Sequence, residues 1–296
     1  MTDLPNRERS KAPRCPSPDL DPLPPRLQAS PGATDTHFHI FGPEQRYPYV
    51  SDRRFTPPEA SVQAYVHLHR TLGLSRAVLV QPSSYGTDNR CQLDAAREMP
   101  FPTRAIVVVP PEVSDRELDE LHASGARAVR FIPTQPGGLP LSKLEHFAAR
   151  LEERGWHIQL MLAPTHLINL APRLEKLRSN FVIDHMGDIL ARDGVAQPAL
   201  QALLRLFQNG RCWTKLSAGY HGSHEAPPYR DMIPLVEALL NAGPDRLLWG
   251  TDWPHINIPG PMPKSTAFLD LLLDWVPDEQ MRNRILVDNP ARLYGF

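Results

Sequence analysis

The chain has 296 residues, of which 41% are hydrophobic and 22% charged, and its formal net charge is −1 at pH 7. This balance is typical of a soluble globular protein, and it argues against a protein whose whole surface binds nucleic acid or a membrane. No apolar run reaches the roughly 18 residues of a membrane span, and the N-terminus lacks the apolar core of a signal peptide. We therefore expect a cytoplasmic protein with no nucleic-acid or membrane partner.

Residues 1–33 are predicted to form a proline-rich arm, because the prolines in this stretch exclude a helix or a central strand. Two forms of the arm are open, a disordered tail or an extended segment packed on the body or on a neighbouring subunit. Leu20, Leu23 and Leu27 would be the apolar anchors of a packed arm. The three cysteines lack a CxxC spacing, so neither a disulfide framework nor a thiolate zinc site is expected.

From residue 34 onward, short apolar or β-branched runs alternate with segments of helical apolar spacing. The expected strands are 34–40, 77–81, 104–109, 126–131, 157–162, 181–184, 212–216 and 247–251. The expected helices are 58–71, 88–98, 114–124, 142–154, 166–178, 197–208, 229–241 and 265–275, with a last helix over 278–287. Ser114 and Glu117 have the spacing of a capping box at the start of the third helix.

Strands that alternate with helices predict a parallel sheet, and eight such units predict a closed (β/α)8 TIM barrel over residues 34–296. An open, doubly wound sheet is the alternative. That fold commonly carries a glycine-rich phosphate-binding turn after its first strand, whereas Gly42 stands alone there. We therefore predict one α/β barrel preceded by the arm.

Polar residues stand at the carboxyl ends of the expected strands, where the active sites of such barrels lie. His37 and His39 are two residues apart and share one face of the first strand. His185 follows the sixth strand, and Asp252 follows the eighth. Imidazoles and a carboxylate in this arrangement bind a metal ion or hydrogen-bond to a substrate oxygen.

This set of residues resembles the amidohydrolase superfamily, and more closely the amidohydrolase-related lactonases typified by 2-pyrone-4,6-dicarboxylate hydrolase. Seven stretches, spread in order over the barrel, carry the resemblance. They are DTHFHIFGP at 35–43, VQPSSYGTDN at 80–89, GARAVRF at 125–131, GWH at 155–157, VIDHMG at 182–187, WGTDWPH at 249–255 and NPARLY at 289–294.

The resemblance implies roles for individual residues. Asp252 would be the base that activates the hydrolytic water, and His37, His39 and His185 would surround the lactone carbonyl. Ser83 and Arg130 match positions that bind a substrate carboxylate or carbonyl oxygen. From the sequence itself, Tyr220 and His221 directly follow the seventh strand and His255 lies beside Asp252, so these three are also candidates for substrate binding.

Two positions of the expected site argue against a bound metal. A typical amidohydrolase site adds a Lys or Glu on strand four and a His at the end of strand five, where this chain has Arg130 and Met161. A guanidinium is permanently charged and cannot be a ligand. We expect no cofactor; the alternative is one Zn²⁺ held by His37, His39 and Asp252, with His185 as a candidate fourth ligand.

The sequence therefore predicts a hydrolase that opens a small carboxylated lactone, either 2-pyrone-4,6-dicarboxylate-like or a sugar-acid lactone. Phe55, Met161 and the stretches 134–138 and 217–221 stand where the pyrone hydrolase has further substrate-binding side chains, so a less anionic substrate is favoured. A related galactarolactone isomerase has Asn at the position of Asp252, and only a carboxylate can take a proton from water. The alternatives are a metal-dependent amidohydrolase or decarboxylase, a lactone isomerase, or an inactive binding barrel, and the protein is a monomer or a homodimer.

Overall fold

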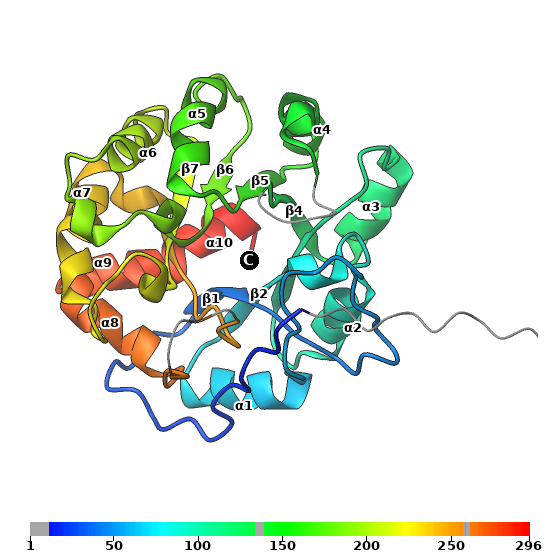
Figure 1. Ribbon diagram of the computed structural model, residues 1–296, viewed down its shortest axis with the longest axis horizontal. Coiled ribbons are helices and arrows are strands. Elements are labelled where there is room, and N and C mark those ends of the chain that lie inside the picture. The colour runs from blue at the N-terminus through cyan, green and yellow to red at the C-terminus, as the bar shows by residue number, and fades with distance from the viewer. Residues whose placement is uncertain (1–11, 134–138, 257, 259–260) are drawn as a thin grey trace, which may run out of the picture.

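Eight parallel strands stand side by side in chain order at the centre of the computed structural model, which describes residues 12–133, 139–256, 258 and 261–296. The strands are β1 (Thr34–Phe38), β2 (Arg76–Val80), β3 (Thr103–Val107), β4 (Ala126–Phe131), β5 (His157–Leu160), β6 (Phe181–Ile183), β7 (Cys212–Leu216) and β8 (Leu247–Trp249). A ring of helices surrounds them, as Figure 1 shows. The predicted (β/α)8 barrel is thus confirmed.

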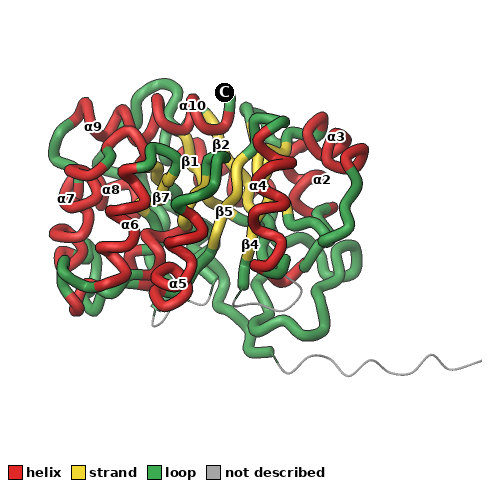
Figure 2. The backbone as a smooth tube through the Cα atoms, turned by 90° about the horizontal axis from the view of Figure 1, so that it is seen from above, coloured by secondary structure: helices red, strands yellow, loops and turns green. Residues whose placement is uncertain are grey.

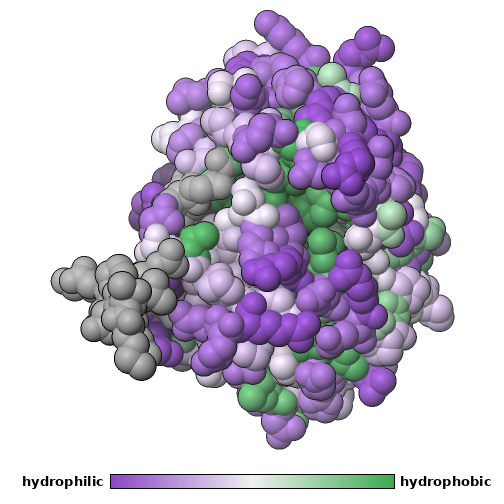
Figure 3. Space-filling model, turned by 90° about the vertical axis from the view of Figure 1, so that its right-hand side faces the viewer, coloured by the Kyte–Doolittle hydropathy of each residue, from purple (hydrophilic) through white to green (hydrophobic). Residues whose placement is uncertain are grey.

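Helices cover the outer face of the barrel. They are α1 (Val62–Thr71), α2 (Arg90–Glu98), α3 (Asp115–Ala123), α4 (Leu144–Glu152), α5 (Pro164–Leu174), α6 (Pro198–Gln208), α7 (Ile233–Ala242), α8 (Ala267–Trp275), α9 (Glu279–Asn283) and α10 (Asn289–Tyr294). The side that carries α2 and α3 is mostly hydrophilic, with hydrophobic residues visible in a central hollow and in smaller patches toward its lower edge (Figure 3). The helices therefore keep their apolar faces against the sheet.

Apolar residues on the strands are buried on both faces of the sheet, because side chains inside the barrel cover one face and the helices cover the other. On β2, Val78 and Val80 point into the barrel, and Ile106 of β3 packs with them. Ala77 and Leu79 of β2 point outward and pack against the helices. The predicted bounds of β4 and β7 are confirmed, and the other strands differ by one or two residues at their ends.

Local capping explains where two helices begin. The capping box of Ser114 and Glu117 is present at the start of α3. The first helix begins at Val62 rather than at the expected residue 58, because the side chain of Ser61 caps it by accepting a hydrogen bond from the backbone N–H of Ala64.

The seam between β8 and β1 closes the barrel. The backbone N–H of Asp252 donates to the carbonyl of His37 over 2.8 Å. The Asp35 carboxylate accepts from the backbone N–H of Thr251 (3.0 Å) and from its hydroxyl (2.6 Å). A Cβ atom at Gly250 would lie 2.7 Å from the backbone nitrogen of His37, so only glycine allows this approach. Asp35 is therefore part of the seam.

The last helix covers the end of the barrel opposite the strand carboxyl ends (Figure 2). Tyr294 of α10 packs on His157 at the start of β5, with their ring centroids 5.3 Å apart, and belongs to the interior cluster. The expectation that one helix over 278–287 ends the chain was wrong. After α9 a π-helical turn at Arg284–Asp288 leads into α10, whose first turn contains Pro290.

The described part of the arm, residues 12–33, runs along the body of the barrel; its first eleven residues lie outside the described part. Asp270 of α8 accepts hydrogen bonds from the backbone N–H groups of Arg26 (2.8 Å) and Leu27 (2.9 Å). Leu27 is buried as expected, but Leu20 and Leu23 are 59% and 55% exposed. The buried prolines Pro18, Pro22 and Pro25 replace these two leucines as anchors.

Candidate active site

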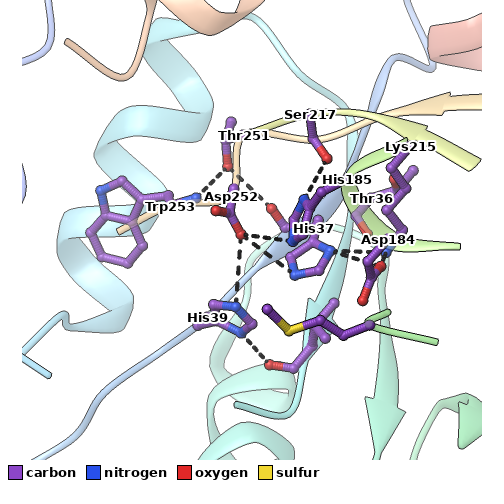
Figure 4. Close-up of polar contacts among 12 residues, drawn as sticks. Thr36, His37, His39, Asp184, His185, Lys215, Ser217, Thr251, Asp252 and Trp253 are labelled. Atoms are coloured by element: carbon purple, nitrogen blue, oxygen red, sulfur yellow. Dashed lines mark hydrogen bonds and ion pairs between the residues drawn. The ribbon is translucent and has the colours of Figure 1, made fainter. Parts of the chain in front are cut away.

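Four of the predicted residues meet at the carboxyl end of the barrel (Figure 4). The Oδ1 atom of Asp252 lies 3.6 Å from Nε2 of His37, 3.9 Å from Nε2 of His39 and 3.6 Å from Nε2 of His185. The alternation of β1 places His37 and His39 on the same side, as the HxH spacing predicted. Three imidazoles thus surround one carboxylate oxygen.

The backbone turns sharply where two of these side chains leave their strands. Asp252 and His185 have φ values of 59° and 51°, in the left-handed region. Few non-glycine residues adopt this conformation, although Asp and His are among the more frequent, and such strain gathers at functional sites.

Asp252 is 4% exposed, yet its environment favours the ionised form. Burial alone would raise the pKa of its carboxyl group, but His185, His37 and His39 together outweigh burial and hold the pKa below its usual value. The hydroxyl of Tyr220 donates a short hydrogen bond to Oδ2. Oδ1 is left to face the histidines and the pocket.

Burial favours the neutral form of the histidine rings around Asp252. Burial and the nearby Arg130 lower the pKa of His39 to about 4, and burial also lowers the pKa of His185. Nδ1 of His39 lies 2.7 Å from the carbonyl oxygen of Val80, which can only accept, so this nitrogen carries the proton. Nδ1 of His185 lies 2.9 Å from the hydroxyl of Ser217.

Beneath the histidines lies a buried charged layer that sequence reasoning missed. The ammonium of Lys215 on β7 lies 2.9 Å from the carbonyl oxygen of Thr36, 3.0 Å from Oε1 of Gln159 and 3.1 Å from Nδ1 of His37. It also forms an ion pair of 3.3 Å with Oδ1 of Asp184. The available signal was a lysine inside β7 and an aspartate directly after the preceding strand, β6.

The Asp184 carboxylate also holds Arg130. Its Oδ2 atom accepts from Nε (3.2 Å) and Nη2 (3.0 Å) of the guanidinium. Burial would raise the pKa of Asp184, but Lys215, His37 and Arg130 hold it well below its usual value. Burial lowers the pKa of Lys215 to about 8 even though Asp184 favours its charged form.

A pocket opens above this cluster. Its wall combines a few polar groups with a largely apolar lining. The lining residues are His39, Phe55, Pro82, Ser83, Arg130, Ile132, Met161, His185, His221, Asp252 and Ile256. Ser83, Arg130 and His221 therefore lie where a substrate would contact them. The stretch 134–138 lies outside the described residues.

His221 forms an ion pair at the mouth of the pocket. Its Nδ1 atom lies 2.8 Å from Oδ1 of Asp188. Burial opposes the charged form of His221, but this hydrogen bond outweighs burial, so the pKa of His221 is raised. The imidazole is therefore the most readily protonated of the histidines at the pocket.

Two expected substrate-binding residues are not on the pocket wall. Tyr220 reaches the site through its bond to Asp252. His255 is fully buried, with Nε2 2.9 Å from the hydroxyl of Ser265. Its backbone N–H donates to the carbonyl of Asp252 over 2.8 Å. His255 therefore lies behind the pocket wall, where it supports the loop that carries Asp252.

The donor set fits a metal ion only in part. Ligand atoms of His37, His185 and Asp252 lie within 4.8 Å of one another, close enough to share an ion. A metal-binding histidine donates its second N–H to an acceptor, and His39 meets this condition through Val80. At His37 the ammonium of Lys215 lies 3.1 Å from Nδ1 and the Asp184 carboxylate lies 3.3 Å from it, so an acceptor alone does not face this nitrogen. The donor set therefore fits a metal less well at His37 than at His39.

Comparison with known proteins agrees with this geometry. A family model described as amidohydrolase matches residues 34–296. The 4-sulfomuconolactone hydrolase of Hydrogenophaga intermedia is 38% identical, with 96% of this chain and 95% of that protein covered. The 2-pyrone-4,6-dicarboxylate hydrolase of Comamonas testosteroni is 33% identical, with 93% of each covered.

The fold has solved counterparts as well. An apo crystal structure from Agrobacterium tumefaciens has a TM-score of 0.83 and 30% identity, and the match covers 92% of this chain and 98% of that chain. In the described residues, no helix is both long and apolar enough to cross a membrane. Sequence, fold and site agree, and the chain belongs to the amidohydrolase family.

Proposed function

We propose that this protein hydrolyses the ring ester of a small carboxylated lactone, with Asp252 as the general base. One observation carries the proposal: a buried, ionised carboxylate faces three imidazoles on the floor of an open pocket. The lactone hydrolases among the relatives support the reaction class. In keeping with their substrates, we place the enzyme in the cytoplasmic catabolism of aromatic or sugar acids.

The reaction follows from the positions of these groups. Oδ1 of Asp252 takes a proton from water while the water oxygen attacks the lactone carbonyl carbon. Histidine N–H groups stabilise the negative oxygen of the tetrahedral intermediate. The ring C–O bond then breaks, and the proton on Asp252 passes to the departing ring oxygen. The opened chain carries a hydroxyl group and a carboxylic acid, and the acid releases the second proton of the water to solvent at neutral pH and becomes a carboxylate.

The pocket wall suggests a compact substrate with one anionic group. Among the described wall residues, Arg130 is the one permanent cation, and Asp184 balances part of its charge. Phe55, Ile132 and Met161 are apolar and suit the faces of a ring. A monocarboxylated or polyhydroxylated lactone therefore fits this wall better than a dicarboxylate does.

A metal-dependent hydrolase or decarboxylase is the second candidate. The observation in its favour is the proximity of ligand atoms from His37, His185 and Asp252. We favour the metal-independent reaction because Lys215 occupies Nδ1 of His37. An isomerase is disfavoured because Asp252 is a carboxylate rather than an amide.

The deciding experiment is a panel of lactones assayed by proton release with enzyme dialysed against a strong chelator, metal loss being confirmed by elemental analysis. We expect turnover of an acid lactone without metal. Arg130→Met should raise KM for the acid far more than for its methyl ester, because a charge-assisted contact is lost. Activity that disappears on stripping and returns with one equivalent of Zn²⁺ would overturn the metal-independent reaction in favour of the second candidate.

A further inference from the structure

We propose that Lys215 is a positioning residue that holds His37 as the Nε2–H tautomer, which makes His37 a hydrogen-bond donor to the reacting oxygen and an unsuitable metal ligand. The inference rests on the proposed function only for the identity of that oxygen. The tautomer itself is a property of the free protein.

The argument begins with the hydrogen-bonding capacity of the lysine. An ammonium has three N–H groups and no lone pair, so every nearby neutral polar atom must accept from it. Lys215 is fully buried, and its closest neighbours are the carbonyl of Thr36, Oε1 of Gln159 and Nδ1 of His37. Oδ1 of Asp184 lies 3.3 Å from the ammonium but has no hydrogen-bond partner among the described residues, so the three donors meet three acceptors, and Nδ1 of His37 is one of them.

Asp184 is the competing partner for the same nitrogen. Its Oδ1 atom lies 3.3 Å from Nδ1 of His37 and would accept a proton from it. The same oxygen lies 3.3 Å from the ammonium of Lys215. A proton on Nδ1 would have to point toward Asp184 while the ammonium nitrogen lay only 3.1 Å from Nδ1. The ammonium of Lys215 can therefore face both Nδ1 of His37 and Oδ1 of Asp184 only when the imidazole proton is on Nε2.

The outward nitrogen of His37 agrees with this assignment. Within the described residues, the buried Nε2 atom has no hydrogen-bond partner. It points toward Asp252, whose Oδ1 atom lies 3.6 Å away. An N–H left unpaired in a buried site is ready to donate to a substrate oxygen, and such preorganised donors stabilise an oxyanion.

The two histidines of β1 are then opposite tautomers. His39 donates from Nδ1 to Val80 and presents a lone pair at Nε2, whereas His37 accepts at Nδ1 and presents an N–H. One ring can donate to the carbonyl oxygen while the other accepts from the attacking water. Metal binding at Nε2 of His37 would require its proton to move to Nδ1, against the ammonium.

Zinc affinity tests the inference without any substrate. Lys215→Met removes the donor but keeps an unbranched side chain, and Arg130→Met is the matched control because it removes the other cation paired with Asp184 without touching His37. Changes in the partners behind a metal-binding histidine alter affinity by roughly 10- to 100-fold. We expect Lys215→Met to bind Zn²⁺ tighter by about this factor in calorimetry, and Arg130→Met to gain much less. Equal gains would mean that charge alone excludes the metal, which would overturn the inference.

The tautomer can also be measured in the unmodified protein, so the test stands even if Lys215→Met does not fold. Nitrogen-15 NMR of histidine-labelled protein distinguishes the two neutral tautomers, and His37→Gln identifies the His37 signals. We expect Nε2 to carry the proton; a proton on Nδ1 would overturn the inference. Lactone assays that fail while NMR shows the Nε2–H form would reject the proposed function but leave this inference intact.

Discussion

Asp252 and Asp184 are buried to nearly the same extent, at 4% and 1% exposure, but their neighbours give them different tasks. Histidines and Tyr220 surround Asp252, and one of its oxygens faces the pocket. Permanently or strongly cationic side chains, Lys215 and Arg130, hold Asp184 below the pocket. A carboxylate paired with such cations is costly to remove, whereas one that faces imidazoles and the pocket remains available to take a proton.

The strongest test of this comparison is Asp252→Asn. An amide cannot accept the proton of the water, and loss of a general base lowers kcat by roughly 10²- to 10⁴-fold. The free energy of unfolding, measured by urea denaturation, should change little because no permanent cation loses its partner. Near-normal hydrolysis in this variant would remove Asp252 as the base.

The corresponding change at the other carboxylate is Asp184→Asn. Removing one partner of a buried ion pair costs about 3–5 kcal/mol, because the remaining charge has no compensation. We expect a loss of this order in the free energy of unfolding, since both Lys215 and Arg130 lose their anion. If Asp184→Asn and Asp252→Asn prove equally stable, the two carboxylates do not differ in the way described.

A smaller effect is expected from Tyr220→Phe. This change removes the hydrogen bond to Oδ2 of Asp252 and leaves the ring in place. A hydrogen bond to a charged group contributes about 1.5–3 kcal/mol, so kcat should fall by roughly tenfold or somewhat more if the bond orients the base. An unchanged kcat with a normal pH profile would show that the hydroxyl does not position Asp252.

The smallest effect concerns pH. Asp252 acts as a base only when ionised, and its pKa lies below the ordinary value of 3.8. His39, with a pKa of about 4, stays neutral over the same range. Lowering the pH from 7 to 5 should therefore leave kcat/KM nearly constant, with loss only near pH 4 and below. A profile that falls between pH 7 and 5 would show that Asp252 is more basic than its surroundings imply.

Sequence patterns predicted the barrel and the side chains at the carboxyl ends of its strands. Both depend on the order of residues within single strands and helices. The HxH spacing places His37 and His39 on one face of β1, and strand ends place His185 and Asp252 at the same mouth. The charged layer depends instead on register between strands. Ile183 lies opposite Thr214, so Asp184 comes beside Lys215, and no single-strand pattern shows this pairing.

The residues predicted to bind substrate show the same division. Arg130 lies near the end of β4, Ser83 and His221 lie shortly after β2 and β7, and all three line the pocket. His255 lies beyond Asp252 on a loop whose backbone turns at φ 60°, and this turn directs the ring into the core. The arm also differs from the prediction, because Leu20 and Leu23 are exposed instead of buried. The path of the arm depends on its contacts with distant helices.

The seam at Gly250 has a consequence for how activity arises during folding. Asp252 and His37 are joined across it by a main-chain hydrogen bond, although 215 residues separate the two partners in the chain. Contacts of such long separation form only after the intervening chain has been ordered. The base and its facing imidazole therefore meet only when the first and last strands have joined. Recovery of turnover during refolding should report the final closure of the barrel, after the recovery of helical signal.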